Sequence, residues 1–309
     1  MKIFYLNNPA SGNKNGAKYF PLIIKELDNR NIEHEFAQTE FAGHGTEIIG
    51  NLDFEKFDGI AVSGGDGTLF ETINGYFANK SSKRIPVGII PIGRGNAFAR
   101  DLGLVSDRWA ESIEAISAGK TKKVDVGLFT TGGKKYYFIN ILGFGFVTDI
   151  AGTAYKLRML GNLSYVLGVF YRTAALNAYD LKIEADGKIL ERENVFVEIS
   201  NSRYTGRDFL MAPSAKLDDG LLDITLLNKL SRSKVLQCLP KIFKGTHIHM
   251  KEVETFQAKH IKIETGTPKL LTPDGQLMGS TPIEVECVPK AIEVFYKAGP
   301  LEKGKNHPM

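Results

Sequence analysis

The sequence predicts an α/β domain followed by an antiparallel β domain. Strands and helices alternate from Lys2 to about Lys123, which is typical of a mostly parallel sheet with its ligand at the carboxyl ends of the strands. After Val124 short segments with period-2 alternation and hairpin turns such as Asp186-Gly187 dominate, which indicates an antiparallel sandwich or barrel. The 309 residues are enough for two cores, and we expect the boundary between residues 124 and 125.

Each element of the first half follows from a local pattern. Apolar runs bounded by turn residues predict strands, and apolar residues spaced along one face predict helices. We expect strands at Ile3–Leu6, Glu35–Gln38, Ile60–Val62 and Val87–Ile92. We expect helices around Phe20–Leu27, Ile48–Leu52 and Leu69–Phe77.

The second half consists mainly of short alternating segments. We expect strands at Tyr136–Ile141, Leu181–Ala185, Val195–Ser200, Leu221–Leu227, Ile261–Glu264, Ile283–Cys287 and Ile292–Tyr296. A helical insert over residues 150–179 and a helix over Lys234–Phe243 interrupt them.

Composition restricts the class of protein. The net charge of +4 suits anionic small molecules or an anionic membrane surface, and we find no concentrated basic stripe that would predict nucleic-acid binding. Cys238 and Cys287 are the only cysteines, which favours a reducing compartment over a disulfide framework. No stretch approaches the roughly 20 apolar residues of a membrane span, so we expect a cytoplasmic protein.

The most informative motif is Gly64-Gly65-Asp66-Gly67-Thr68, between an apolar strand and a helix. Strand, glycine loop and helix present free backbone N–H groups and a positive helix end to a phosphate. A bare carboxylate would repel that phosphate. The presence of the Asp66 carboxylate in this loop is explained if it accepts a proton from an incoming hydroxyl or works beside magnesium. The motif therefore favours phosphoryl transfer.

Two further loops close neighbouring strands. Asn7–Gly12 follows the first strand, and Gly93–Asn96 follows the fourth. Each loop alone is an ordinary connection to a helix. Together with the Gly64–Thr68 loop they form a rim of N–H donors that could hold a nucleotide triphosphate.

These motifs, in this order, resemble the diacylglycerol kinase catalytic-domain family, which includes bacterial lipid kinases as well as sphingosine and ceramide kinases. The resemblance continues into the second half and covers nearly the whole chain. Its segments are Asn8–Gly12, Gly64–Thr68, Pro91–Ala99, Gly143–Phe146, Lys216–Asp223, Asp274-Gly275, Gly279 and Pro282–Val285.

The resemblance implies a Rossmann-like nucleotide-binding α/β domain (1–124) and a C-terminal antiparallel β-sandwich domain (125–289) for the lipid substrate. The segment 290–309 would return to the first domain, and ATP would lie in the interdomain cleft. The implied nucleotide-contacting residues are Asn8, Pro9, Ser11, Gly12, Thr39, Gly64, Gly65, Asp66, Gly67, Thr68, Glu71, Gly93, Arg94, Gly95 and Asn96. Arg94 stands where the family most often has threonine, and it can add a charge-assisted hydrogen bond to phosphate.

The family also implies a structural magnesium ion. Its ligands would be the Asp219 carboxylate and the backbone oxygens of Lys216 and Leu221, an oxygen-only set that suits magnesium.

Gln276 departs from the family, whose bacterial members usually have glutamate there as the proton acceptor. A neutral amide can orient an alcohol but cannot deprotonate it. Either Asp66 or Asp274 supplies the base, or the chain is a weak or inactive kinase.

The insert after Ala151 carries aromatic and leucine residues with Lys156 and Arg158 among them. Such a helix either lies at a membrane interface or packs on the β domain with its basic residues solvated. Asp149 falls where sphingosine kinases place a headgroup-recognising aspartate. We therefore expect a lipid substrate at a membrane surface, with peripheral membrane association, and a homodimer is left open.

The leading function is an ATP- and magnesium-dependent lipid kinase of phospholipid metabolism, acting on a diacylglycerol-like lipid. An NAD kinase shares the Gly-Gly-Asp-Gly loop, although the Asn-Pro loop and the Lys216–Asp223 turn argue against it. A nucleotide-binding lipid sensor without turnover is the third alternative, and Gln276 is the residue that favours it.

Overall fold

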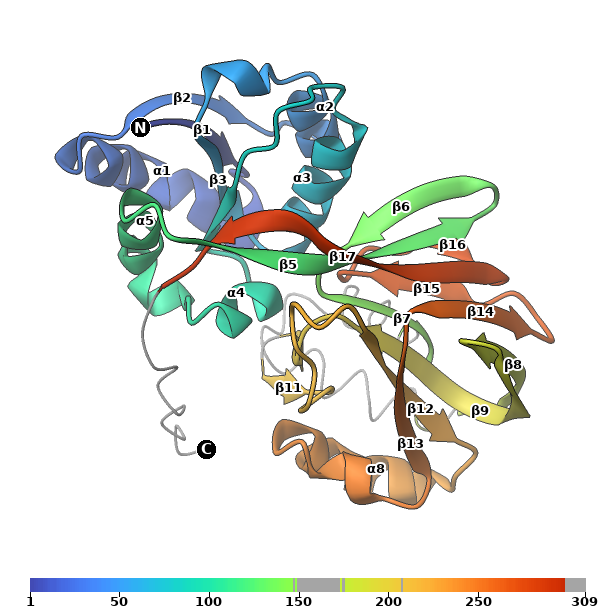
Figure 1. Ribbon diagram of the computed structural model, residues 1–309. Coiled ribbons are helices and arrows are strands. Elements are labelled where there is room, and N and C mark those ends of the chain that lie inside the picture. Colours follow the sequence, from blue (N-terminus) through green and yellow to red (C-terminus); the bar gives the residue numbers. More distant parts are fainter. Residues whose placement is uncertain (147, 149–172, 174–175, 207, 298–309) are drawn as a thin grey trace. The chain divides into compact units, whose positions relative to one another are not determined.

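The computed structural model describes residues 1–146, 148, 173, 176–206 and 208–297 (Figure 1). The chain divides into two compact units, Met1–Val124 with Ile292–Met309, and Asp125–Ala291. Among the described residues, no helix has the length and apolarity to cross a membrane.

The first unit is built on a parallel sheet. Its strands are β1 (Lys2–Asn7), β2 (Glu33–Gln38), β3 (Gly59–Gly64) and β4 (Val87–Pro91), joined by the end of β17 (Ile283–Phe295). The order is β17-β4-β3-β1-β2. Strands β3 and β4 are buried along their whole length, as expected for parallel strands with helices on both faces.

Helices cover both faces of this sheet (Figure 1). They are α1 (Ser11–Asn29), α2 (His44–Gly50), α3 (Asp66–Ala78), α4 (Ala97–Asp101) and α5 (Ala110–Ser117), with short 3₁₀ turns at Phe54–Lys56 and Ser106–Arg108. Ile23 and Leu27 of α1 and Ile113 and Ile116 of α5 share one buried cluster with Tyr5. Helices α2 and α3 pack together.

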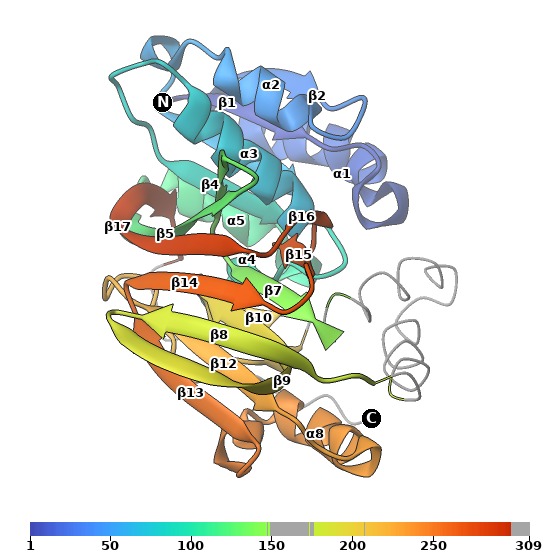
Figure 2. The same cartoon turned by 90° about the vertical axis from the view of Figure 1, so that its right-hand side faces the viewer.

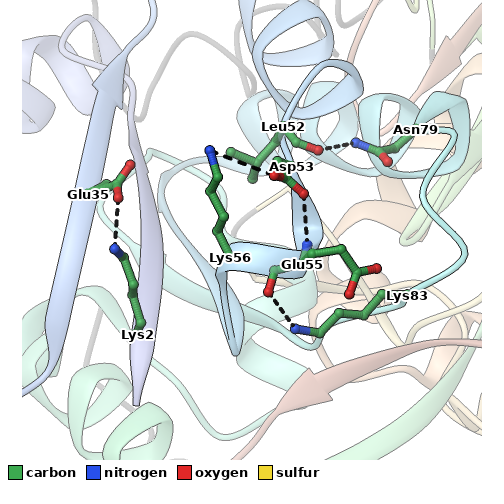
Figure 3. Close-up of polar contacts among 8 residues, drawn as sticks. All are labelled: Lys2, Glu35, Leu52, Asp53, Glu55, Lys56, Asn79 and Lys83. Carbon is green, nitrogen blue, oxygen red and sulfur yellow. Dashed lines mark hydrogen bonds and ion pairs between the residues drawn. The ribbon is translucent and has the colours of Figure 1, made fainter.

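Polar contacts fix the remaining connections of the first unit (Figure 3). Lys2 pairs with Glu35 across β1 and β2 at 2.9 Å. After α3, the Asn79 amide donates to the carbonyl of Leu52 at 2.8 Å, and Lys83 Nζ donates to the carbonyl of Glu55 at 3.2 Å. These bonds hold the chain that leads from α3 into β4.

The second unit is an antiparallel β-sandwich domain. Its strands are β5 (Thr121–Thr131), β6 (Lys134–Phe138), β7 (Ile141–Gly145), β8 (Tyr179–Ala185), β9 (Lys188–Ser200), β10 (Tyr204–Thr205), β11 (Phe209–Leu210), β12 (Leu222–Asn228), β13 (Val253–Ala258), β14 (His260–Thr265), β15 (Leu270–Pro273), β16 (Met278–Ser280) and most of β17. Helix α8 (Arg232–Phe243) and a 3₁₀ turn at Thr246–His249 are its described helical elements.

Strand β9 is the centre of this unit. Its first half pairs with β8, and its second half pairs with β7 on one side and β12 on the other. Figure 2 shows β14, β8, β9, β12 and β13 side by side. Alternate residues of β8, β9, β12 and β14 enter one large core cluster with Phe129, Phe138 and Phe144.

Two predicted elements differ from the structure. The expected strand Tyr136–Ile141 is two strands, β6 and β7, because the carboxylate of Asp274 takes the backbone N–H groups of residues 139–141. The two expected strands Ile283–Cys287 and Ile292–Tyr296 are one strand, β17, which passes through Lys290 at a φ of 50°. Most of the expected helical insert lies outside the described residues.

Candidate active site

The loop after β3 is locked onto the loop after β4. The carbonyl of Gly64 accepts the N–H groups of Ile92 at 3.1 Å and Gly93 at 3.0 Å. A Cβ on Gly93 would lie 2.3 Å from the Cα of Gly65, closer than any real Cβ contact. The two loops are therefore in backbone contact, and any side chain at position 93 would separate them.

The loop after β1 joins the same group. Asn8 Nδ2 donates to Thr68 Oγ1 at 2.8 Å, and a Cβ on Gly12 would lie 2.1 Å from the carbonyl oxygen of Ile92. A Cβ on Gly65 would be 3.8 Å from Ser11 Oγ. The structure thus brings the three loops together at the carboxyl ends of β1, β3 and β4, where parallel sheets bind their ligands.

Asp66 is the first residue of α3 and is half-buried. Its Oδ1 accepts the backbone N–H of Ala97 at 2.9 Å, so the carboxylate caps α4. Burial raises the pKa of the Asp66 carboxyl to about 6, against the lowering effect of the N–H groups of Phe98, Ala97 and Asn96. A carboxyl with this pKa can take up a proton near neutral pH.

Asn96 fixes the third loop from within. It lies at a φ of 58°, its Oδ1 accepts the N–H of Gly93 at 3.1 Å, and its Nδ2 donates to the carbonyl of Gly93 at 2.8 Å. Arg94 is exposed, and none of the described residues pairs with its guanidinium. The loop therefore presents an unpaired cation next to the glycine backbone, which is the chemistry that recognises phosphate.

Glu71 and Thr39 hold the chain that follows β2 in place. The Glu71 carboxylate accepts the N–H of Gly43 at 2.8 Å and of Gly45 at 3.0 Å, so it anchors the start of α2 onto α3. The N–H of Thr39 donates to the carbonyl of Asn7 at 2.9 Å. The Glu71 carboxylate thus binds backbone N–H groups of the chain that follows β2.

A polar network that no sequence motif predicted lies beneath the loops. Tyr5 Oη lies 2.8 Å from Ser63 Oγ, and Ser63 Oγ donates to Asn7 Oδ1 at 2.7 Å. All three side chains are buried, and burial raises the pKa of the Tyr5 phenol. Within the described part of the chain, Asn7 Nδ2 has no hydrogen-bond partner. The sequence does hint at this network, because the polar residues Asn7 and Ser63 lie at the ends of two apolar strands.

Asp274, predicted as a possible base, is buried in the second unit with both oxygens bonded to backbone. Oδ2 accepts the N–H of Ile139 at 3.0 Å, and Oδ1 accepts those of Asn140 at 3.0 Å and Ile141 at 2.9 Å. This arrangement gives Asp274 a structural role in the turn that presents Gln276. The Gln276 side chain is exposed, and its N–H donates to the carbonyl of Pro273 at 2.8 Å.

The predicted magnesium turn lies before β12. Asp219 is exposed, and its Oδ1 accepts the N–H of Leu221 at 3.1 Å. An exposed carboxylate is a ligand that magnesium prefers, so Asp219 fits this ion. An open hollow of about 460 Å³ adjoins the turn, with Asp218, Asp219 and Lys259 in its lining.

Asp125, which the sequence analysis also missed, holds this turn in place. The side chain is fully buried. Its Oδ2 accepts the N–H of Gly220 and its Oδ1 that of Lys290, both at 2.6 Å. The backbone N–H of Asp125 donates to the carbonyl of Leu217 at 2.7 Å. One carboxylate therefore connects β5, the acidic turn and β17.

The three residues predicted to bind lipid, Asp149, Lys156 and Arg158, lie outside the described residues.

Comparison with known proteins gives the same two-part division. The family profile described as diacylglycerol kinase catalytic domain matches residues 2–129. The profile described as YegS C-terminal NAD kinase beta sandwich-like domain matches residues 141–296.

Curated relatives match along nearly the whole chain. A diacylglycerol kinase of Bacillus subtilis is 28% identical over 300 residues, which is 96% of each chain. A diacylglycerol kinase of Staphylococcus aureus is 30% identical and is matched over 93% of this chain and 90% of its own. Sphingosine kinase 1 of Arabidopsis thaliana is 25% identical over 96% of this chain and 72% of its own.

Among solved structures, a diacylglycerol kinase from Bacillus anthracis strain Sterne superimposes with a TM-score of 0.72 at 26% identity. The match covers 96% of this chain and 97% of that chain.

Proposed function

Because the chain belongs to the diacylglycerol kinase catalytic-domain family, we propose that it is an ATP- and magnesium-dependent kinase that phosphorylates the hydroxyl of a membrane lipid, with diacylglycerol as the leading candidate. The observation that carries the proposal is the contact of the three glycine-rich loops, with Gly93 against Gly65 and Gly12 against Ile92. Relatives that cover the chain from end to end and are named diacylglycerol kinase support the choice of lipid.

In this proposal the backbone of Gly64–Thr68 and Gly93–Asn96 holds the phosphates of ATP. Arg94 is exposed and unpaired among the described residues. Its guanidinium donates a charge-assisted hydrogen bond to the terminal phosphate. Phosphoryl transfer depends mainly on positioning and on stabilising charge, and loops that are in backbone contact before the nucleotide arrives need little reorganisation.

Asp66 is the proposed proton acceptor. The lipid hydroxyl oxygen forms a bond to the γ-phosphorus, the bond from that phosphorus to the oxygen of the departing ADP breaks, and the hydroxyl proton passes to the Asp66 carboxylate. Its pKa of about 6 leaves it mostly ionised at neutral pH, yet close enough to accept a proton. Asp274 is not the base in this account, because its carboxylate is buried and anchors the N–H groups of Ile139, Asn140 and Ile141, whereas Asp66 is half-buried.

The turn at Asp219 is the proposed magnesium site, with the carbonyl oxygens of Lys216 and Leu221 as the other ligands. Bound there, the ion would neutralise the carboxylate and cross-link the turn. The buried Asp125, which binds the N–H of Gly220, holds this turn for the ion. We further propose that the protein meets its lipid at the membrane surface without insertion, drawn by its net charge of +4.

The test combines three acceptors. Purified protein is incubated with labelled ATP and magnesium, together with phosphatidylcholine vesicles that contain diacylglycerol, with plain vesicles, or with NAD. The proposal expects label in the lipid extract of the first mixture only. Label in NAD would instead identify an NAD kinase, the alternative that shares the Gly-Gly-Asp-Gly loop.

A nucleotide-binding lipid sensor is the second candidate, because the exposed Gln276 has no proton-accepting group. ATP binding without ATP consumption, with every lipid offered, would favour this candidate over the kinase.

A further inference from the structure

Strand β2 is the open edge of the first unit's sheet (Figure 1). Among the described residues, it pairs with β1 alone. The backbone N–H groups of Glu33 and Thr39 donate to carbonyls of the chain at β1, at 3.1 and 2.9 Å, and a parallel ladder uses every second residue of a strand. The N–H and C=O groups of His34, Phe36 and Gln38 therefore point away from β1.

This edge lacks the features that usually keep an exposed strand from pairing. Proteins protect such edges with lysine or proline, with bulges, or with a covering element. Strand β2 contains neither lysine nor proline, and its register with β1 is continuous. Its two acids, Glu33 and Glu35, both pair with Lys2, at 3.0 and 2.9 Å, so their charge is balanced within the chain.

An exposed aromatic residue lies in the middle of this edge. Phe36 is 54% exposed, and its ring packs edge-on against Phe20 of α1, with the ring centroids 5.0 Å apart. The ring is thus held by α1 while about half of the residue remains in water. An aromatic surface beside unpaired backbone groups is the chemistry that a further β-strand recognises.

The pattern of β2 fits a second copy of the same strand in antiparallel orientation. With a two-fold axis at Phe36, His34 lies opposite Gln38 of the partner subunit, and Phe36 lies opposite its own copy. Every outward N–H and C=O of the strand then has a partner, and the aromatic pair on the axis adds to the stability. An axis one residue later would pair His34 with Glu40 of the partner subunit, which lies beyond the end of β2.

The positions of the acids favour the same register. With the axis at Phe36, Glu35 faces Ala37 of the partner subunit and Glu33 faces Thr39 of the partner subunit. No two acids are opposite each other in this arrangement. An axis one residue earlier would place Glu35 against its own copy, and like charges directly opposite are destabilising. The charge pattern therefore disfavours that register.

We propose that the protein forms a symmetric homodimer in which β2 pairs with β2 of a second copy, antiparallel about Phe36. The two parallel sheets then become one continuous sheet. A second copy is the partner rather than another peptide, because one strand supplies both halves of the complementary pattern, as a two-fold interface requires. The interface lies wholly in the first unit and does not depend on the proposed function.

Sedimentation velocity of the full chain over a concentration series, at low salt, measures the dimer. We expect Phe36→Lys to raise its Kd at least about 10-fold, because two like charges replace the aromatic pair on the axis. Gln38→Pro should also weaken the dimer, because it removes an outward N–H and leaves the ladder with β1 intact.

The matched control is Ile189→Lys. Ile189 is also an exposed apolar strand residue, 57% exposed, but it lies in β9 of the second unit. This variant should leave the dimer unchanged. Thermal melts establish that each variant is folded.

Two further measurements test the register and the surface. Ala37→Lys places a cation opposite Glu35 of the partner subunit and should lower the Kd at least about 2-fold, whereas Ala37→Glu should raise it by a similar factor. In hydrogen exchange, the amides of β2 should exchange more slowly as the protein concentration rises. Those of β13, which pairs with β12 alone among the described strands, should not change.

Three results would overturn the proposal. The first is a wild type that stays monomeric throughout the concentration series. The second is a dimer that both Phe36→Lys and Gln38→Pro leave intact, because such a dimer uses another surface. The third is an equal effect of Ala37→Lys and Ala37→Glu, which contradicts the register about Phe36. Lipid phosphorylation by a monomeric wild type would leave the proposed function standing and remove this inference alone.

Discussion

Asp66 Oδ1 accepts the backbone N–H of Ala97 at 2.9 Å, which ties the first residue of α3 to the first residue of α4. The residue that we expect to accept a proton therefore also sets the position of the loop after β4. In the proposed function one carboxylate would serve both binding and chemistry, so a substitution at this position has to separate the two roles.

Asp66→Asn separates them, because the amide oxygen can still accept the N–H of Ala97 while the proton acceptor is lost. We predict that turnover falls by at least ~100-fold, the lower range for general-base catalysis, while ATP still binds. Turnover and ATP affinity measured on the same preparation check this. Unchanged turnover would remove Asp66 from the mechanism.

The pH profile of the wild type tests the same group. The carboxyl works as a base only when it is ionised, so turnover should rise as pH increases through about 6. The folded-state pKa is above the ordinary 3.8, so this group's contribution to stability is present below about 3.8 and lost as pH rises through 6. Asp66→Asn should therefore not lower the melting temperature at pH 7.

Gln276→Glu should raise turnover, because it places a proton acceptor where the chain now has an amide. The side chain is exposed, and the turn is held by Asp274 and by the Gln276 N–H, so the substitution should not disturb the fold. Gln276→Ala is the control, because it removes the amide that could orient the lipid hydroxyl and adds no proton acceptor. If the glutamate variant is no faster than wild type, position 276 takes no part in proton transfer.

Asp219→Ala should remove the effect of magnesium on thermal stability, because the turn loses the ligand that carries charge. The melting temperature is measured with magnesium and with a chelator. Asp218→Ala, the neighbouring acid of the same turn, is the matched control and should keep the response. A magnesium-dependent melting temperature in Asp219→Ala would mean that the ion binds elsewhere.

Asp274→Ala should destabilise the second unit strongly, since three buried N–H groups lose their acceptor. We predict a loss of about 2–5 kcal/mol in the free energy of unfolding, measured in urea. Asp186→Ala is the control, because that carboxylate also accepts N–H groups, from Lys259 and His260, but is exposed to water. Equal losses in the two variants would contradict the buried role of Asp274.

Local sequence patterns predicted the strands and loops of the first unit, because these elements depend mainly on neighbouring residues. Apolar runs ending in glycine and asparagine located β1, β3 and β4 and the three loops at their ends. The parallel sheet then brings those ends together, which is why the contacts of Gly12, Gly65 and Gly93 could be anticipated.

Features that depend on distant pairings could not be predicted in this way. The break between β6 and β7 comes from Asp274, 135 residues beyond Ile139. Alternation places Glu198 opposite Val197, but it does not tell whether that face is covered. In the sequence, Asp125 is a single acid in a predicted strand. Its role in holding the acidic turn depends on the fold, which brings the N–H groups of Gly220 and Lys290 to its carboxylate.

The most direct test of the central claim is phosphate transfer from labelled ATP to an extracted membrane-lipid mixture, followed by separation of the lipids. We predict one labelled lipid species with the wild-type chain, dependent on magnesium, and at least ~100-fold less label with Asp66→Asn. No labelled lipid with the wild type, under conditions where ATP binds, would contradict the assignment as a lipid kinase.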